Sequence, residues 1–169
     1  MRNITPFGII DGMEKTAELL VAWLRERGLT CATAESCTGG WVGKAITSVP
    51  GASDVYLGGV VSYANSVKMD VLGVPHEVLE RVGAVSRDCA IAMALGARSL
   101  TKADRAVSVT GIAGPGGGSE LKPVGTVWFA LATADGAKAE MCVFKGGRDE
   151  IRRSAVMKAL ELLGEEDGR

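Results

Sequence analysis

The sequence predicts an α/β fold: a single three-layer α/β/α domain around a mixed, mainly parallel sheet. Apolar runs of strand length alternate with segments of helical period along most of the chain, which is typical of βαβ units. Glycine is abundant, with 23 residues, yet it falls at the junctions between these segments and forms no linker. The length of 169 residues suits one hydrophobic core, so we expect residues 1–169 to form one domain.

The first half of the chain predicts helices and strands in turn. Asp11 and Glu14 resemble a capping box that starts a helix, and Gly28 is typical of its end. Its apolar stripe has helical spacing and consists of Ala17, Leu20, Val21 and Leu24. A strand at 29–35 leads into a helix over 39–48. The next predicted elements are a strand at 55–63 and two short helices at 66–72 and 75–81.

The second half begins with a longer helix, for which Ser86 is the predicted N-cap. The apolar stripe of this helix is Ala90, Met93, Ala94 and Ala97. The remaining predicted elements are a strand at 105–109, a buried strand at 127–132, a strand at 138–144 and a helix at 148–163. A tight turn at 134–136 joins the last two strands, which places an antiparallel member in the sheet. The final helix turns Val156, Ala159, Leu160 and Leu163 toward the core.

Composition excludes several classes of function. The formal net charge is −1, so a nucleic acid or an anionic membrane surface would not attract the protein over long range. No apolar run approaches the roughly 18 residues of a membrane span. The N-terminus lacks the pattern of a secretion signal, and we expect a cytoplasmic protein. Four scattered cysteines and a single histidine make a metal site unexpected, and the cysteines are expected to be reduced.

Three segments rich in small polar residues follow predicted strands, at 34–40, 62–68 and 110–119. Ligands in such folds bind beyond the carboxyl ends of parallel strands, so these segments are the candidate site. The third holds five glycines between 111 and 118, which would let backbone N–H groups face a phosphate or carboxylate. It matches neither the Walker loop nor the dinucleotide fingerprint, and a surface loop without a ligand is the alternative.

The stretch TAESCTGG places Ser36 at the head of a helix, where a nucleophile would gain from the helix dipole and from free N–H groups. Alternatively, Ser36 or Thr38 merely caps that helix. A serine nucleophile needs a base, and Lys68 is preferred to His76 because it follows the neighbouring strand. Burial, or a second cation, would lower the pKa of the lysine enough for this role. Cys37 competes with Ser36 for the role of nucleophile.

Five stretches in order resemble the CinA C-terminal family, the nicotinamide mononucleotide deamidases: TAESCTGGWV, GVVSYANSVKMDVLGV, GAVSRDCAIAMA, VSVTGIAGPGGGSELKPVGTVWFALA and GGRDEIRR. The similarity runs from about residue 12 to about residue 164. It implies a single α/β/α domain, usually assembled as a dimer, that needs no metal or organic cofactor. It also implies hydrolysis of nicotinamide mononucleotide to nicotinate mononucleotide and ammonia, which returns a breakdown product of NAD to cofactor synthesis. Some members carry an extra N-terminal domain, and we expect this protein to lack that domain and its activity.

The resemblance also implies roles for particular residues. Ser36 is the nucleophile, and Lys68 is the base, oriented by Tyr63 or relaying a proton through it. Thr110 holds the reacting amide, and Arg148 binds the phosphate or tunes Lys68. Backbone N–H groups near residues 38–40 would stabilise the oxyanion. The implied substrate-binding residues are Glu35, Cys37, Thr38, Gly39, Gly40, Gly111, Gly114, Gly116, Gly117 and Ser119.

One departure from the family pattern is Gly116, which stands where other members carry a polar residue. The alternative function is a nucleotide-binding module in which the glycine loop holds a phosphate and Ser36 only caps a helix. Hydrolysis of another small amide or ester is a third interpretation.

Overall fold

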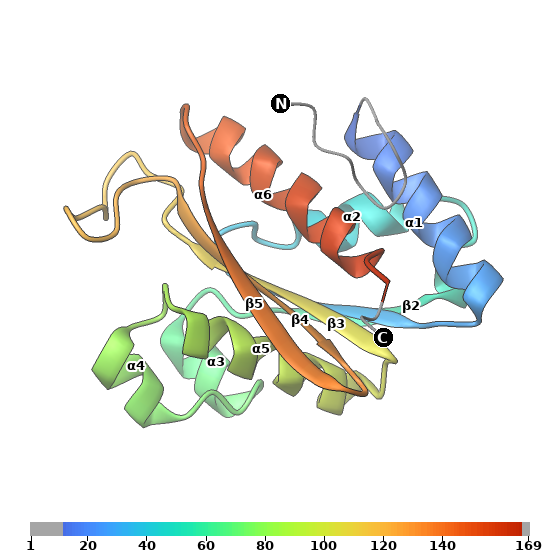
Figure 1. The fold of residues 1–169 in the computed structure, drawn as a ribbon, viewed down its shortest axis with the longest axis horizontal. Helices are drawn as coiled ribbons and strands as arrows, with labels where there is room; N and C mark the ends of the chain where they lie inside the picture. Colours follow the sequence, from blue (N-terminus) through green and yellow to red (C-terminus); the bar gives the residue numbers. More distant parts are fainter. Residues whose placement is uncertain (1–11, 167–169) are drawn as a thin grey trace.

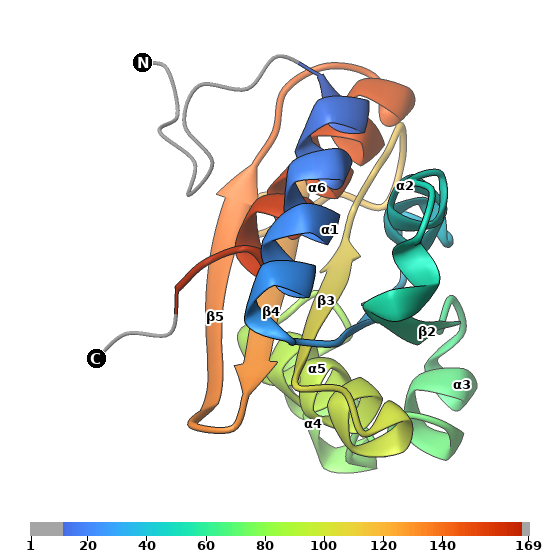
Figure 2. The ribbon, with the colours of Figure 1, turned by 90° about the vertical axis from the view of Figure 1, so that its right-hand side faces the viewer.

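The computed structural model describes residues 12–166, which form a five-stranded sheet with helices on both faces (Figure 1). The strands, in the order β2-β1-β3-β4-β5, are β1 (Cys31–Glu35), β2 (Tyr56–Val61), β3 (Arg105–Gly111), β4 (Thr126–Thr133) and β5 (Gly136–Val143). β1 is parallel to β2 and β3, whereas β4 is antiparallel to both β3 and β5. Only β4 therefore runs against the others, and β2 and β5 are the edges (Figure 2). The predicted mixed, mainly parallel sheet is confirmed.

The helices of the described residues are α1 (Met13–Arg27), α2 (Trp41–Thr47), α3 (Asn65–Asp70), α4 (His76–Val82), α5 (Arg87–Thr101) and α6 (Arg148–Leu163), with a 3-10 turn at Ala52–Asp54. Helices α1, α2 and α6 cover one face of the sheet, and α3, α4 and α5 lie on the other (Figure 1). The apolar stripes predicted for α1, α5 and α6 are all buried. Between residues 12 and 166, no helix has the length and apolar character needed to cross a membrane.

Burial along the strands follows their place in the sheet. Every residue of β1 is buried because this strand is central and helices cover both of its faces. The edge strand β2 instead alternates between partly buried and exposed residues. On the α5 face, small residues line the contact with the sheet, and Ala32, Ala34 and Ala106 pack against Met93. These small side chains allow α5 to lie close to the strands that carry the polar loops.

Predicted and observed elements differ at their ends. β2 stops at Val61, short of the predicted end at 63, because its partner β1 ends at Glu35, the residue opposite Val61. β3 continues to Gly111, beyond the predicted end at 109, because antiparallel pairing with β4 extends that far. The predicted capping box includes Asp11, which lies outside the described residues, and the residue at the N-cap of α1 is Gly12.

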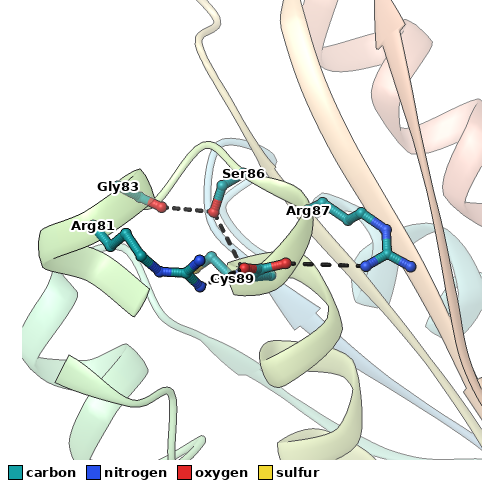
Figure 3. Close-up of polar contacts among 6 residues, drawn as sticks. Arg81, Gly83, Ser86, Arg87 and Cys89 are labelled. Atoms are coloured by element: carbon teal, nitrogen blue, oxygen red, sulfur yellow. Dashed lines mark hydrogen bonds and ion pairs between the residues drawn. The ribbon is translucent and has the colours of Figure 1, made fainter. Parts of the chain in front are cut away.

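The predicted N-cap of α5 is confirmed, and it shapes one wall of the site. The Ser86 hydroxyl accepts a hydrogen bond from the Cys89 N–H at 3.2 Å and donates to the Gly83 carbonyl at 2.7 Å (Figure 3). An ion pair of 2.7 Å between Arg81 and Asp88 joins the end of α4 to the start of α5. The intervening residues 84 and 85 are thereby held between two helix ends.

Gly96 lets α5 approach the segment that follows α3. A Cβ atom at this position would lie 2.0 Å from the backbone oxygen of Leu72, which real structures do not tolerate. Leu72 is buried and lies two residues beyond the end of α3, the helix that carries Lys68. Close packing at Gly96 therefore sets how near the segment after α3 lies to α5.

We predict that Gly96→Ala destabilises the protein by about 2 kcal/mol, because the added methyl group overpacks the contact with Leu72. The sign of this change in stability is diagnostic, because Gly→Ala at an open position in a helix stabilises a protein by about 1 kcal/mol. Urea denaturation measures the free energy of unfolding, with Ser99→Ala on the exposed side of α5 as the control. A Gly96→Ala protein as stable as the wild type would contradict the packing described.

Candidate active site

The carboxyl ends of β1, β2 and β3 lie next to one another, and each strand leads into one of the three polar loops. The loops line a cleft of about 290 Å³, together with residues between α4 and α5 and the start of α6. A larger hollow between α1 and α2 borders Gly12, where the described residues begin, and contains none of the three loops. Ten predicted site residues line the cleft: Ser36, Cys37, Tyr63, Lys68, Thr110, Gly111, Gly114, Gly116, Gly117 and Arg148.

Ser36 and Lys68 meet inside the cleft. The Ser36 amide donates to the Val109 carbonyl at 2.9 Å, which ties the first residue after β1 to the neighbouring strand β3. Lys68 projects from α3, and its Nζ lies 3.1 Å from Ser36 Oγ. The same Nζ donates to the carbonyl of Ser62 at 2.6 Å and to that of Tyr63 at 3.3 Å. The amine is thus held by three oxygen atoms.

Lys68 is only 1% exposed, although it carries a titratable amine. Burial disfavours the charged form and lowers the pKa of Lys68 below its ordinary value of 10.5. The thiols of Cys89 and Cys37 act in the opposite direction and have the smaller effect on this pKa. A lysine with a lowered pKa that touches a serine hydroxyl can exchange a proton with it.

The other candidate nucleophile and the other candidate base are less well placed. Burial raises the pKa of the Cys37 thiol to about 11, so this side chain is protonated at neutral pH. His76 lies on α4 with a ring nitrogen 3.4 Å from the Glu80 carboxylate, and it does not line the cleft. Among the described residues, no group of three or more His, Cys, Asp or Glu side chains could hold a metal ion.

Glu35 holds the loop that carries Ser36. Its side chain is 1% exposed, and its carboxylate accepts hydrogen bonds from the N–H groups of Gly40, Val42 and Gly43 at 2.9–3.0 Å. These are donors at the start of α2, which a helix otherwise leaves without partners. The carboxylate therefore occupies the end of the helix that was expected to stabilise a developing negative charge.

Hydrogen bonding in this loop narrows the set of possible oxyanion donors. The Gly39 amide donates to the Ser36 carbonyl at 3.1 Å, and the Gly40 amide donates to Glu35, so neither N–H faces a ligand as expected. Within residues 12–166, no other residue accepts from the N–H groups of Cys37 and Thr38. Thr38 is closed to solvent, whereas Cys37 lines the cleft. Of these two N–H groups, only that of Cys37 therefore belongs to a residue that lines the cleft.

Five predicted site residues do not line the cleft: Glu35, Thr38, Gly39, Gly40 and Ser119. The first four form the interior of the Ser36 loop and support it from behind. Ser119 lies farther along the glycine loop, where its amide donates to the Lys122 carbonyl at 2.9 Å and its hydroxyl accepts from the Lys122 amide at 3.1 Å. This local turn uses the polar groups of Ser119.

Arg148 and Tyr63 form the outer rim of the cleft. Arg148, the first residue of α6, donates to the Gly114 carbonyl at 2.7 Å and to the Tyr63 hydroxyl at 3.1 Å. Tyr63 is 61% exposed, so the rim is open to solvent. None of the described residues that line the cleft is acidic, and Lys68 and Arg148 are its two basic side chains. The charge of Arg148, with no acidic side chain among these residues to offset it, favours an anionic ligand.

Thr110 and the glycine loop also line the cleft. The Thr110 hydroxyl donates to the Ala84 carbonyl at 2.9 Å, which fixes the segment between α4 and α5 against β3. A Cβ atom at Gly116 would meet no atom within 4 Å, whereas at Gly114 it would lie 2.5 Å from Val124. Gly114 is therefore required by packing, and Gly116 leaves open space beside the cleft.

Sequence reasoning missed Ala84 and Val85, which line the cleft, and Arg152, which contacts the Ser36 loop from behind. The two apolar residues gave no chemical signal, although the Ser86 cap marked their position. Arg152 lies one turn after Arg148 on α6, and its spacing resembled that of any solvated helix residue.

Comparisons with known proteins indicate one and the same family. A sequence model of the CinA C-terminal domain matches residues 13–166. The nicotinamide-nucleotide amidohydrolase PncC of Escherichia coli (strain K12) is 52% identical over 142 residues, which cover 83% of this chain and 86% of the relative. A CinA-like protein of Synechococcus sp. (strain RCC307) is 52% identical over 159 residues, which cover 93% of this chain. This chain spans only 38% of the length of that relative.

Solved structures agree with these similarities. The crystal structure of the competence/damage inducible protein CihA from Agrobacterium tumefaciens has a TM-score of 0.87 and 45% sequence identity, and the match covers 92% of this chain and 96% of that one. The family match over nearly the whole described range, the 52% identity to PncC and this shared fold agree. The chain belongs to the CinA C-terminal domain family.

Proposed function

We propose that this protein hydrolyses the carboxamide of nicotinamide mononucleotide to nicotinate mononucleotide and ammonia. The observation that carries the proposal is the buried Lys68 amine, 3.1 Å from the Ser36 hydroxyl at the floor of the cleft. The 52% identity to an E. coli protein that is named a nicotinamide-nucleotide amidohydrolase supports the choice of substrate. The absence of acidic side chains among the described cleft residues supports a phosphorylated ligand.

The hydrogen bonds of Lys68 explain how it would act as a base. A neutral amine has two N–H groups and one lone pair. The carbonyls of Ser62 and Tyr63 can accept only from the N–H groups, which leaves the lone pair for the remaining neighbour, Ser36 Oγ–H. The two backbone carbonyls therefore orient the amine for removal of the serine proton.

The reaction proceeds in two halves. Ser36 Oγ attacks the carboxamide carbon as Lys68 accepts its proton, and the Cys37 N–H stabilises the oxyanion, as the residue after a nucleophile often does. The C–N bond then breaks, and Lys68 returns the proton to the leaving ammonia. A water molecule attacks the acyl-enzyme, again giving its proton to Lys68, and Ser36 leaves with that proton. Arg148 and the N–H groups of the loop at 114–117 would bind the phosphate.

The family resemblance extends the proposal beyond the reaction itself. We expect one catalytic domain over residues 1–169 that acts as a homodimer in the cytoplasm. We also expect it to return a breakdown product of NAD to cofactor synthesis. Gel filtration and cell fractionation test the first two of these expectations directly.

Ser36→Ala is predicted to reduce kcat for ammonia release from nicotinamide mononucleotide by a factor on the order of 10⁴, because it removes the nucleophile. The measurement is a coupled ammonia assay, with Ser48→Ala on the exposed end of α2 as a matched control. Near-normal turnover by Ser36→Ala would reject the mechanism. Nucleotide binding by the wild type without ammonia release would instead favour the binding module.

The pH dependence of kcat/KM is predicted to show an acidic limb set by Lys68. The neutral amine is the active form, so the rate rises as pH rises through the Lys68 pKa and then levels off. Burial lowers this pKa, which places the limb below 10.5. Initial rates between about pH 6 and about pH 10 test the prediction, since an unperturbed lysine would show no plateau there. A rate that falls with pH across this range would show that the protonated lysine is the active form.

A further inference from the structure

Arg152 touches the Ser36 loop at two successive peptide groups. Its Nε donates to the Cys37 carbonyl and one terminal nitrogen donates to the Thr38 carbonyl, both at 3.1 Å. The planar guanidinium presents its N–H groups in a fixed fork, so one side chain fixes two peptide planes at once. The contact joins α6 to a loop that lies more than a hundred residues earlier in the chain.

The guanidinium is itself held in place. Its Cζ lies 5.4 Å from the centroid of the Trp41 ring, at the start of α2, within the range of a cation–π contact. The Asp149 carboxylate lies 3.7 Å from another of its nitrogens, but Asp149 is 90% exposed and contributes little. Packing between Trp41 and the loop therefore sets the position of Arg152.

The loop needs such a restraint. Gly39 and Gly40 both have positive φ, 62° and 93°, and glycine has no side chain to limit its backbone. Because a trans peptide is planar, fixing the Cys37 carbonyl also fixes the Thr38 N–H on the opposite side. The Cys37 N–H and the Ser36 residue, whose side chain bears the hydroxyl, lie immediately before this peptide group in the chain.

From these contacts we infer that Arg152 is a positioning residue for the Ser36 loop, holding the hydroxyl of residue 36 and the N–H of residue 37 in their reactive geometry. The inference rests on the proposed function for its catalytic consequence. Arg152 does not line the cleft and touches no substrate, so its loss affects the reaction step and not binding. A misplacement of about 1 Å in such a site can cost about a hundredfold in rate.

The test uses Arg152→Met and Arg152→Lys, with Arg153→Met as the control. Arg153 is the exposed neighbour on α6 and does not line the cleft. Arg152→Met is expected to lower kcat about ten- to a hundredfold and to leave KM within about threefold. The kcat of Arg152→Lys is expected to lie between those of Arg152→Met and the wild type. An ammonium group can bind one carbonyl but cannot span both. Unchanged kcat in folded Arg152→Met, or a raised KM with unchanged kcat, overturns the inference.

Hydrogen–deuterium exchange separates this inference from the proposed function. The Gly39 and Gly40 amides are expected to exchange about tenfold faster in Arg152→Met than in the wild type or in Arg153→Met, with α5 amides unchanged. This readout does not require any reaction. If the wild type releases no ammonia, the proposed function fails, and faster exchange at these two amides still supports the restraint. Equal exchange in all three proteins overturns the restraint, whatever the activity.

Discussion

The site depends on the burial of one amine. Lys68 is almost completely enclosed, and three oxygen atoms, two of them backbone carbonyls, surround its Nζ. Removal from water disfavours the charged form, and the carbonyls determine which direction remains for the lone pair. The Ser36 hydroxyl occupies that direction. The burial of Lys68 thus lowers its pKa, and its contact with Ser36 gives the orientation that the proposed mechanism requires of the nucleophile.

The surrounding fold keeps this contact in register. β1 and β3 hold Ser36 through its amide, and close packing at Gly96 fixes the segment that follows α3 against α5. Glu35 satisfies the first amides of α2, and Arg152 binds the carbonyls on the other side of the same loop. The loop is thereby restrained from two directions, which leaves few of its polar groups without a partner. The Cys37 N–H, for which no other described residue offers a backbone acceptor, is the group that the proposed mechanism assigns to the oxyanion.

Much of the fold could be predicted because its local signals agree with its tertiary packing. The stripe Ala90, Met93, Ala94 and Ala97 and the Ser86 cap are visible in the sequence and are found as expected. Convergence of Ser36 and Lys68 followed from their places after parallel neighbouring strands. Which amides Glu35 binds could not be derived, because periodicity does not show which donors a buried carboxylate will meet. Arg152 was equally hidden, since its contact spans 115 positions of sequence.

The most direct test of this account is the titration of the Lys68 amine itself. NMR of protein labelled with ¹⁵N at lysine side chains, with Lys68→Arg to assign the signal, measures its pKa in the free protein. Burial of the amine leads us to expect a pKa clearly below 10.5, and a change in that signal when Ser36 is replaced by Ala. A Lys68 pKa at or above 10.5 would show that the amine is charged at the pH of the reaction. It could not then take the Ser36 proton, and the central claim would fail.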